Sequence, residues 1–398
     1  MNYPQLVLKR GRERWLLRGH PWVFRVAVAS HPVEIAPGEI VDVVDTGGRF
    51  VARGYYNPHS SIPVRVLTRD AKQEVDRGLI KDRIRRAQGL RSQSLDFNQT
   101  TGYRVVHSEN DFLPGLVVDR YGDFLVVQVH TLGMEQHKAW VVEGLEEVFS
   151  PRGIYERSNV GGRQGEGLET MPVGDLWGEG PPDRVEILEN GVRFLCDIRE
   201  GQKMGFFLDQ RENRQGVRER SDGKSVLNCF SYSGGFSVYA ALGGATQVES
   251  VDASEPALML AHENLRMNGL DPEAHPCVIA NVFDYLKQCK EDGRAYDMVV
   301  VDPPAFAKSR PALKRATRAY GRLNRLAMGL VRVGGTLVSA SCSPPVDYES
   351  FVEILQGAAA EAGRSIQMTR SHLQSVDHPI LPAFPEGRYL KCFFCVVD

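Results

Sequence analysis

Two side chains that could carry covalent and acid–base chemistry stand directly after apolar runs of the sequence. Asp302 follows Met298–Val301, and the two prolines after it, Pro303 and Pro304, prevent the chain from continuing as a paired strand. Cys342 follows another apolar run and precedes a second Pro-Pro pair. A thiolate that adds to carbon 6 of a pyrimidine makes carbon 5 nucleophilic, and a nearby carboxylate can orient or protonate the ring. The alternative interpretations are a solvated strand cap for Asp302 and a small buried apolar side chain for Cys342.

Three further strand ends carry polar residues that suit a nucleoside. The segment 228–236 turns from an expected strand into a helix without the G-x-G-x-x-G pattern that cradles a pyrophosphate. Asp252 ends the next expected strand, where a carboxylate can accept hydrogen bonds from both ribose hydroxyls. Asn281 and Val282 follow the strand after that, where they could hold an adenine. Because these positions fit a nucleoside but no phosphate, the pattern favours S-adenosylmethionine as cofactor over the dinucleotide of a dehydrogenase.

Alternating strands and helices from about residue 185 onward would bring these strand ends together. The expected strands are apolar without alternation, which is typical of parallel strands buried on both faces. Repeated β-α units with right-handed crossovers place the carboxyl ends of the strands at one edge of a sheet. We therefore predict a doubly wound, mostly parallel α/β domain. Its longest helix is expected over 313–333, ending at Gly334 and Gly335.

Two smaller units are predicted to precede this domain. The first contains short strands between turns and no helix period of any length, which favours a small β-barrel. Its clearest strands are expected at 39–45, 49–56 and 62–67. The second unit combines a charged amphipathic helix near 75–91 with strands and Gly-rich turns, which indicates an α+β domain without a catalytic constellation. The predicted domains are 1–75, 76–190 and 191–398.

Composition limits the class of protein. The chain has 398 residues, 42% of them hydrophobic and 25% charged, with a net charge of −2, as expected for a soluble globular protein of two or three domains. No apolar run approaches the roughly 18 residues of a membrane span, and no signal peptide is recognisable. Seven cysteines, an odd number, indicate reduced thiols and a cytoplasmic protein. Cys392 and Cys395 would point to opposite faces of a strand, so we expect no metal site.

Two stretches of the chain are strongly basic, although the net charge of the whole chain is close to zero. Residues 9–25 contain six Lys or Arg and one acid, and residues 308–325 contain seven and no acid. Such stretches attract phosphate backbones, and Trp22 and Phe24 beside the first one could stack on RNA bases. A solvated helix face and a pair of aromatic core residues explain the same pattern. The candidate RNA-binding residues are Lys9, Arg10, Arg12, Arg14, Lys308, Arg315 and Arg318.

Together these residues resemble the class I S-adenosylmethionine-dependent methyltransferases. Nearly the whole chain resembles, more narrowly, the bacterial RlmI-like 23S ribosomal RNA 5-methylcytosine methyltransferases. The runs that carry this resemblance are Gly19–Phe24, Ala52–Pro58, Leu113–Arg120, Lys203–Arg211, Leu227–Tyr232, Val301–Pro304 and Ser341–Ser343.

The resemblance implies a fold and a set of roles. The fold is an N-terminal RNA-binding barrel of the pseudouridine synthase and archaeosine transglycosylase (PUA) type, a central α+β domain, and a Rossmann-like domain whose last strand is reversed. The implied substrate is 23S ribosomal RNA, with Cys342 as covalent nucleophile and Asp302 near the target ring and the charged end of the cofactor. Residues 203–211 would be a strand and turn that close over the cofactor. The residues predicted to bind S-adenosylmethionine are Gln210, Asn228, Phe230, Ser231, Asp252, Ala253, Asn281, Val282 and Asp302.

The sequence departs from the family pattern in two places and leaves alternatives open. Asn281 stands where relatives often have an acid, and Ala305 where two-cysteine enzymes carry their second cysteine. One catalytic thiol therefore remains, and the base that removes the carbon-5 proton is not identified. Asp302–Pro304 with Phe306 also resembles the motif of amino-group methylation, which would make a methylated guanine. A non-catalytic, RNA-binding ribosome-assembly protein is a further alternative, and the sequence is compatible with a homodimer.

Overall fold

The computed structural model describes residues 3–30, 35–307 and 309–398. The chain divides into two compact units, each made from separate stretches of sequence. Unit 1 contains Met1–Ile187, Cys196–Phe206 and Val376–Gly387, and unit 2 contains Leu188–Leu195, Phe207–Ser375 and Arg388–Asp398. Unit 1 contains the predicted barrel and nearly all of the predicted central domain. The division of this unit into two separate domains stays a prediction. No helix in the described part of the chain is long and apolar enough to cross a membrane.

The first sheet of unit 1 has six strands in the order β2-β6-β5-β4-β1-β3. Its pairs are antiparallel except that between β1 and β4. Strands predicted at 39–45, 49–56 and 62–67 are confirmed as β4, β5 and β6, and their inward side chains fill one apolar core. The elements are β1 (Gln5–Leu8), α1 (Glu13–Leu17), β2 (Trp22–Val23), β3 (Val28–Ser30), β4 (Ile40–Val44), β5 (Phe50–Tyr56) and β6 (Val64–Thr68).

The second sheet of unit 1 has the order β11-β10-β9-β8-β7 and shares its core with α2 and α4. Helix α2 begins where Asp76 Oδ1 accepts a hydrogen bond from Leu79 N at 2.8 Å, and it buries Ile80 and Ile84. The elements are α2 (Arg77–Ser92), β7 (Gly102–His107), β8 (Leu116–Tyr121), β9 (Phe124–Val129), α3 (Leu132–Gln136), α4 (Lys138–Phe149), β10 (Gly153–Arg157) and β11 (Val173–Gly178). A two-stranded hairpin follows, formed by β12 (Val185–Glu189) and β13 (Val192–Cys196).

Unit 2 contains a seven-stranded sheet in the order β16-β15-β14-β17-β18-β20-β19. The first five strands of this order are parallel, and β20 runs antiparallel to both of its neighbours, so the predicted doubly wound sheet with a reversed last strand is confirmed. The strands are β14 (Ser225–Cys229), β15 (Gln247–Asp252), β16 (Cys277–Ile279), β17 (Tyr296–Val301), β18 (Val331–Ser341), β19 (Ile366–His372) and β20 (Lys391–Val397).

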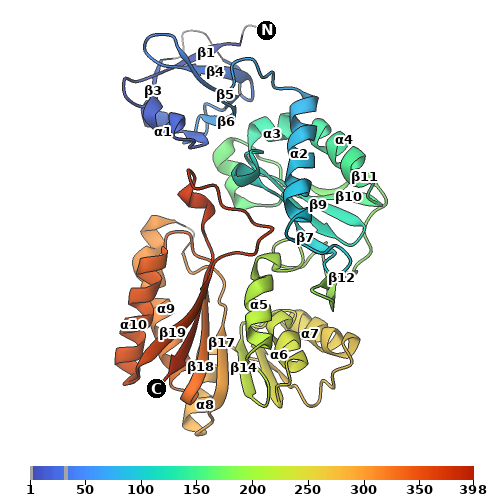
Figure 1. The fold of residues 1–398 in the computed structure, drawn as a ribbon, viewed down its shortest axis with the longest axis vertical. Helices are drawn as coiled ribbons and strands as arrows, with labels where there is room; N and C mark the ends of the chain where they lie inside the picture. Colours follow the sequence, from blue (N-terminus) through green and yellow to red (C-terminus); the bar gives the residue numbers. More distant parts are fainter. Residues whose placement is uncertain (1–2, 31–34, 308) are drawn as a thin grey trace. The chain divides into compact units, whose positions relative to one another are not determined.

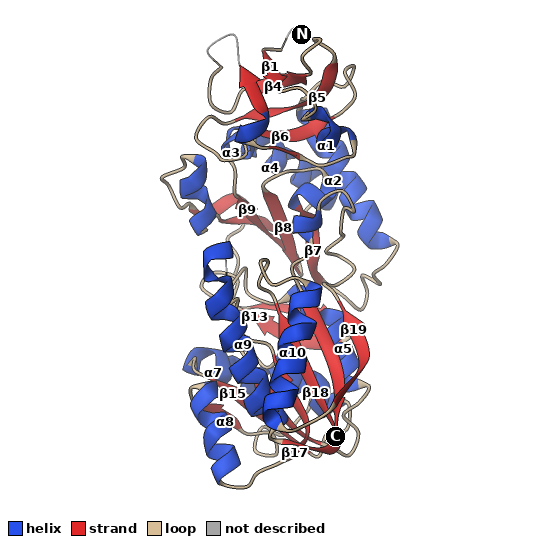
Figure 2. Cartoon of the chain, turned by 90° about the vertical axis from the view of Figure 1, so that its left-hand side faces the viewer, coloured by secondary structure: helices blue, strands red, loops and turns tan. Residues whose placement is uncertain are grey.

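Helices cover both faces of this sheet. Helices α8, α9 and α10 share one apolar core with the strands, and α9 and α10 lie next to each other in front of the sheet in Figure 2. Helices α5, α6 and α7 lie on the other side (Figure 1). The helices are α5 (Arg211–Arg218), α6 (Gly235–Leu242), α7 (Glu255–Met267), α8 (Val282–Glu291), α9 (Leu313–Met328) and α10 (Tyr348–Ala362).

Two predicted elements are wrong. Helix α9 ends at Met328 rather than at residue 333, because Val331 already pairs with Tyr296 as part of β18. Gly334, at φ 75°, and Gly335 lie where the pairing register shifts, so this glycine pair kinks a strand instead of ending a helix. The strand expected within 203–211 is also absent from this described segment. A 3₁₀ turn over Leu208–Gln210 leads directly into α5 there.

Candidate active site

The loop after β14 forms the first part of the candidate site and has a strained backbone. Phe230 and Tyr232 have positive φ angles of 58° and 47°. This region of φ is unfavourable for residues other than glycine, and residues held in it cluster at ligand sites. Ser231 N donates to Val251 O at 3.1 Å and thereby fastens the loop to β15. The loop is therefore held in one conformation at the carboxyl end of the sheet.

Buried polar atoms at the end of β14 and in this loop lack a partner within the described part of the chain. Asn228 Nδ2 donates to Ser237 Oγ at 2.8 Å, whereas Asn228 Oδ1 and the hydroxyls of Ser231 and Ser233 have no hydrogen-bond partner among the described residues. The three side chains are only 1%, 6% and 1% exposed. Buried polar atoms are normally paired, so these are suited to a polar ligand. A cofactor that carries an amino acid and a ribose but no phosphate, such as S-adenosylmethionine, fits this set.

Asp252 ends β15 with both carboxylate oxygens bound to the main chain. Oδ2 accepts from Tyr232 N and Oδ1 accepts from Ser254 N, each at 2.9 Å. Each oxygen still has a lone pair for a second donor, and the side chain is half-buried next to the exposed Ala253. Asp252 is thus held in place by the loop after β14 while keeping the capacity to accept hydrogen bonds from ribose hydroxyls.

The predicted adenine-binding residues already have structural roles. Asn281 Oδ1 accepts from Phe283 N at 3.0 Å and caps α8, so its carbonyl is shared with the helix. Val282 is 3% exposed and belongs to the core beneath α8. A contact from these residues to an adenine would therefore use the Asn281 amide nitrogen or the main chain.

Gln210 is buried at the start of α5, where its Oε1 accepts from Asn213 Nδ2 at 2.6 Å. Phe207, at the start of the same turn, meets the ring of Tyr232 edge-on with ring centroids 5.3 Å apart. The turn that carries Gln210 therefore packs against the loop after β14, which brings it to the same part of unit 2 as Asn228.

Asp302 and Cys342 leave neighbouring parallel strands, β17 and β18, at the same edge of the sheet. Cys342 Sγ lies 3.9 Å from the carbonyl oxygen of Pro303, and both Cys342 and Asp302 are half-buried. Asp302 also influences Cys392 on β20 electrostatically. The thiol that the sequence singled out therefore lies beside the turn that Asp302 begins.

Two residues near this thiol, Tyr320 and Lys391, were missed at the sequence level. Ser343 Oγ accepts from Ala307 N at 3.1 Å and lies 3.0 Å from the hydroxyl of Tyr320 on α9, which ties the loop after β18 to the loop after β17. Lys391, at the start of β20, donates from Nζ to Ser343 O at 3.0 Å. One signal was available, because Lys391 is a cation that opens the apolar run 392–397.

Burial disfavours the thiolate form of most of the other cysteines. Burial raises the pKa of the thiols of Cys229, Cys277, Cys289, Cys392 and Cys395. Cys196 is fully buried. Across residues 3–30, 35–307 and 309–398, no group of His, Cys, Asp and Glu is arranged to hold a metal ion.

The first predicted RNA-binding stretch surrounds α1 in unit 1. Arg12 and Arg14 line a hollow together with Trp15 and Trp22, and Trp15 is 50% exposed. Flat aromatic surfaces beside cations suit unstacked bases and their phosphates. The predicted residues here are Lys9, Arg10, Arg12 and Arg14, all of them exposed.

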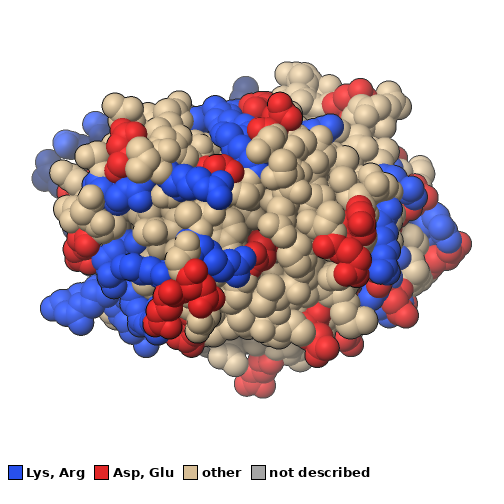
Figure 3. Space-filling view, turned by 90° about the horizontal axis from the view of Figure 1, so that it is seen from below, with Lys and Arg blue, Asp and Glu red and all other residues tan. Residues whose placement is uncertain are grey.

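The second stretch lies on α9 in unit 2. Arg315, Arg318 and Arg322 are exposed at helical spacing, and the Arg322 guanidinium lies 5.2 Å from the ring centroid of Phe283. Lys308, also predicted to bind RNA, lies outside the described residues. Figure 3 shows Lys and Arg next to Asp and Glu over the face in view, so contacts with RNA would depend on such local stretches.

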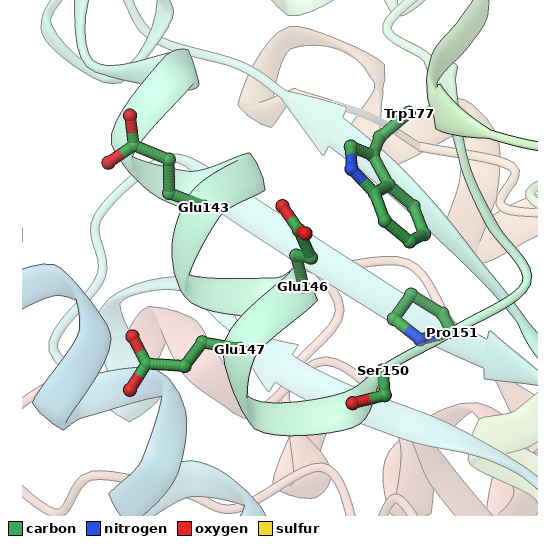
Figure 4. Close-up of a pocket in the computed structure, with 6 residues that line it drawn as sticks. All are labelled: Glu143, Glu146, Glu147, Ser150, Pro151 and Trp177. Atoms are coloured by element: carbon green, nitrogen blue, oxygen red, sulfur yellow. The ribbon is translucent and has the colours of Figure 1, made fainter.

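A hollow beside α4 has the opposite charge. Three glutamates project from the helix there, and Glu146 faces Trp177 across the hollow (Figure 4). Glu143 and Glu147 also pair with Arg77 at 3.4 Å and Lys81 at 3.1 Å on α2. An acidic lining repels phosphate, so this hollow is not a candidate for binding an RNA backbone.

Comparison with known proteins identifies the class of the two domains. Residues 173–379 match the S-adenosylmethionine-dependent methyltransferase family, and residues 6–69 match the PUA-like domain. A solved methyltransferase complexed with SAH (S-adenosylhomocysteine) has 23% sequence identity, a TM-score of 0.86, and coverage of 99% of this chain and 100% of that chain. An S-adenosylmethionine-dependent methyltransferase from Streptococcus mutans gives a TM-score of 0.85 at the same identity and coverage. The chain is therefore an S-adenosylmethionine-dependent methyltransferase with an N-terminal PUA-like domain.

Full-length relatives define the family more narrowly. The ribosomal RNA large subunit methyltransferase I of Klebsiella pneumoniae (strain 342) is 41% identical over 395 residues, which cover 99% of this chain and 98% of the relative. The protein of the same name from Salmonella arizonae is 41% identical over 396 residues, covering 100% and 98%. The chain belongs to the family of ribosomal RNA large subunit methyltransferase I.

Proposed function

We propose that the protein transfers a methyl group from S-adenosylmethionine to carbon 5 of a cytosine in 23S ribosomal RNA, through a covalent bond between Cys342 and carbon 6. The observation that carries the proposal is the position of the Cys342 thiol, 3.9 Å from Pro303 O and beside the Asp302 turn. The family relationship supports ribosomal RNA as the substrate. Burial raises the pKa of the thiols of Cys229, Cys392 and Cys395, which disfavours each of them as the nucleophile.

The proposed reaction begins when Cys342 loses its proton and the thiolate forms a bond to carbon 6. The electron pair of the carbon 5–carbon 6 double bond then makes carbon 5 nucleophilic. Bound S-adenosylmethionine supplies an electrophilic methyl group on a sulfonium, and carbon 5 takes this group while the sulfonium becomes a neutral thioether. A base removes the carbon-5 proton, and its electron pair restores the double bond as the carbon–sulfur bond breaks. Cys342 is thereby regenerated as a thiolate.

Asp302 is assigned the task of orienting the ring and protonating it as the thiolate adds. Its place between Val301 and two prolines keeps the carboxyl group at the end of β17. Asp302→Asn should lower turnover more than RNA affinity, because the ring is activated only in the transition state. The exposed residues around α1 and on α9 are assigned to the RNA backbone.

Nucleoside mass spectrometry of 23S ribosomal RNA treated with the protein tests the base and the nucleophile together. Wild type should produce 5-methylcytidine, whereas Cys342→Ala should bind cofactor and produce none. Cys277→Ala is a matched control, because that half-buried thiol lies on the edge strand β16, and it should remain active. Full activity of Cys342→Ala would refute the covalent mechanism, and methylguanosine without 5-methylcytidine would select amino-group methylation instead.

RNA containing 5-fluorocytidine tests the covalent bond directly. Fluorine at carbon 5 cannot leave as a proton, so elimination is blocked after methyl transfer and the protein should stay attached to the RNA. We expect an adduct that is stable in denaturing gels, requires S-adenosylmethionine, and maps by peptide sequencing to Cys342. An adduct at another cysteine would contradict the assignment.

A further inference from the structure

Lys391 carries a buried ammonium group that, within the described part of the chain, bonds to main-chain oxygens and to no carboxylate. Its side chain is 3% exposed, and Nζ donates to the carbonyl oxygens of Ser343 at 3.0 Å, Val346 at 2.5 Å and Tyr389 at 2.9 Å. Lys391 also pairs with Ser341 across the antiparallel strands β18 and β20. All three N–H groups are thus used by main-chain oxygens, two of them in the loop that follows Cys342.

A buried cation of this kind is costly unless a negative charge lies near it, and lysine is rarely buried when unpaired. Burial lowers the pKa of Lys391 to about 8, and the two groups that act against this shift are Cys342 and, more weakly, Asp347. The Asp347 carboxylate is already bound, since it accepts from Ser350 N at 2.9 Å as the cap of α10. The thiolate of Cys342 is therefore the counter-charge that would complete the environment of Lys391.

Other titratable groups in the described part of the chain also face this region. Tyr320 reaches it from α9, and Asp302 and Cys392 approach the same region from the end of β17 and from β20. Asp347 faces Lys391 from the start of α10. Each of these four groups is neutral or negative when it titrates, whereas Lys391 carries a positive charge that can compensate a thiolate at position 342.

We propose that Lys391 is a positioning residue for Cys342, whose ammonium fixes the main chain of residues 343–346 and stabilises the thiolate. The role rests on the proposed function, in which Cys342 is the nucleophile. Lys391 keeps its proton throughout: the thiol proton passes to solvent before attack, the thiolate bonds to carbon 6, and the same thiolate leaves at elimination. The ammonium therefore favours both the formation and the departure of the nucleophile without taking part in a bond.

The test is the pH profile of Cys342 alkylation by iodoacetamide, followed at each cysteine by peptide mass spectrometry in the full-length protein. Only the thiolate reacts, so the rate reports its population. In wild type, Cys342 should reach half of its maximal rate at a lower pH than Cys277, whose thiol pKa is raised by burial. A half-maximal pH equal to or above that of Cys277 would overturn the proposal without any variant.

Variants then separate charge from structure. Lys391→Gln keeps two donors for the loop but removes the charge, and Lys391→Met removes both. Each should lower the Cys342 alkylation rate at neutral pH about tenfold and move its profile to higher pH, while the Cys277 rate stays unchanged. Lys287→Met is the matched control, since that lysine lies exposed on α8 and pairs with Asp284. A Cys342 profile in folded Lys391→Gln that matches wild type would overturn the proposal.

The alkylation measurement needs neither RNA nor turnover, so its result does not depend on whether the proposed function is correct. An altered profile together with an active Cys342→Ala protein would retain the Lys391–Cys342 coupling and reject covalent catalysis. An unaltered profile together with an inactive Cys342→Ala protein would reject the coupling and retain the nucleophile.

Discussion

Replacing Asp252 by asparagine gives the sharpest test of the cofactor site. Both carboxylate oxygens accept main-chain hydrogen bonds, from Tyr232 N and Ser254 N at 2.9 Å. An amide can accept only one of these, and its NH₂ group would face the other N–H donor. The substitution therefore removes a charge-assisted hydrogen bond and places two donors against each other in the loop that follows β14.

The size of the effect follows from the number of bonds involved. A hydrogen bond to a charged group contributes about 1.5–3 kcal/mol. Loss of one such bond to a ribose hydroxyl corresponds to roughly a 10- to 150-fold weaker affinity for the cofactor. Loss of the Tyr232 contact adds to this, because a loosened loop no longer presents the acceptor in place.

Calorimetry with S-adenosylhomocysteine measures the loss, and an analogue without the ribose hydroxyls identifies its cause. We expect Asp252→Asn to weaken binding of S-adenosylhomocysteine by the amount above but to affect the dideoxy analogue much less. Asp284→Asn is the control, because that carboxylate is exposed and pairs with Lys287 at 2.8 Å. An affinity within about twofold of wild type for Asp252→Asn would refute the ribose assignment. An equal loss for both ligands would show that Asp252 acts only through the loop.

Three further predictions concern stability and RNA binding. Glu189→Gln should lower the free energy of unfolding of unit 2 by about 3–5 kcal/mol in urea denaturation, because the buried Arg214, whose Nε donates to Glu189 at 2.7 Å, loses this carboxylate as its partner. A change below about 1 kcal/mol would contradict this. Burial lowers the pKa of Lys391 in the folded state to about 8, so the unfolded chain binds more protons than the folded chain between about pH 7.5 and about pH 9.5. Over this window the free energy of unfolding of wild type, measured relative to that of Lys391→Met, should therefore rise by about 2 kcal/mol. Far-UV circular dichroism can follow this difference in stability, and a fall with rising pH would contradict a lowered pKa for Lys391. The double substitution Arg12→Ala and Arg14→Ala should weaken RNA binding in anisotropy titrations. It should also reduce the slope of the logarithm of the binding constant against the logarithm of the salt concentration by about 1.5. An unchanged slope would show that α1 does not contact the RNA.

Much of the fold was accessible from local patterns. The buried strands of unit 2 were recognised because parallel strands covered on both faces are continuously apolar, and the strands 39–45 and 49–56 because a Gly-Gly turn separates two β-rich runs. The prediction failed at 331–335, where Val-Arg-Val-Gly-Gly suits a helix end as well as a kinked strand. Pairing with Tyr296 decided between them, and that contact is not visible in a local window.

The sequence by itself determined which residues stand at the carboxyl ends of the parallel strands, and therefore that Asn228, Asp252, Asp302 and Cys342 belong to one edge of a sheet. It could do so because strand ends are marked by local breaks such as the Pro-Pro pairs. Tertiary structure alone decided what surrounds the thiol. The reversed strand β20 inserts between β18 and β19 and brings Lys391 opposite Ser341, the residue before Cys342. The spacing of residues in the sequence does not predict the contact between Lys391 and Ser341, because the antiparallel pairing of distant segments is fixed only when the whole sheet assembles.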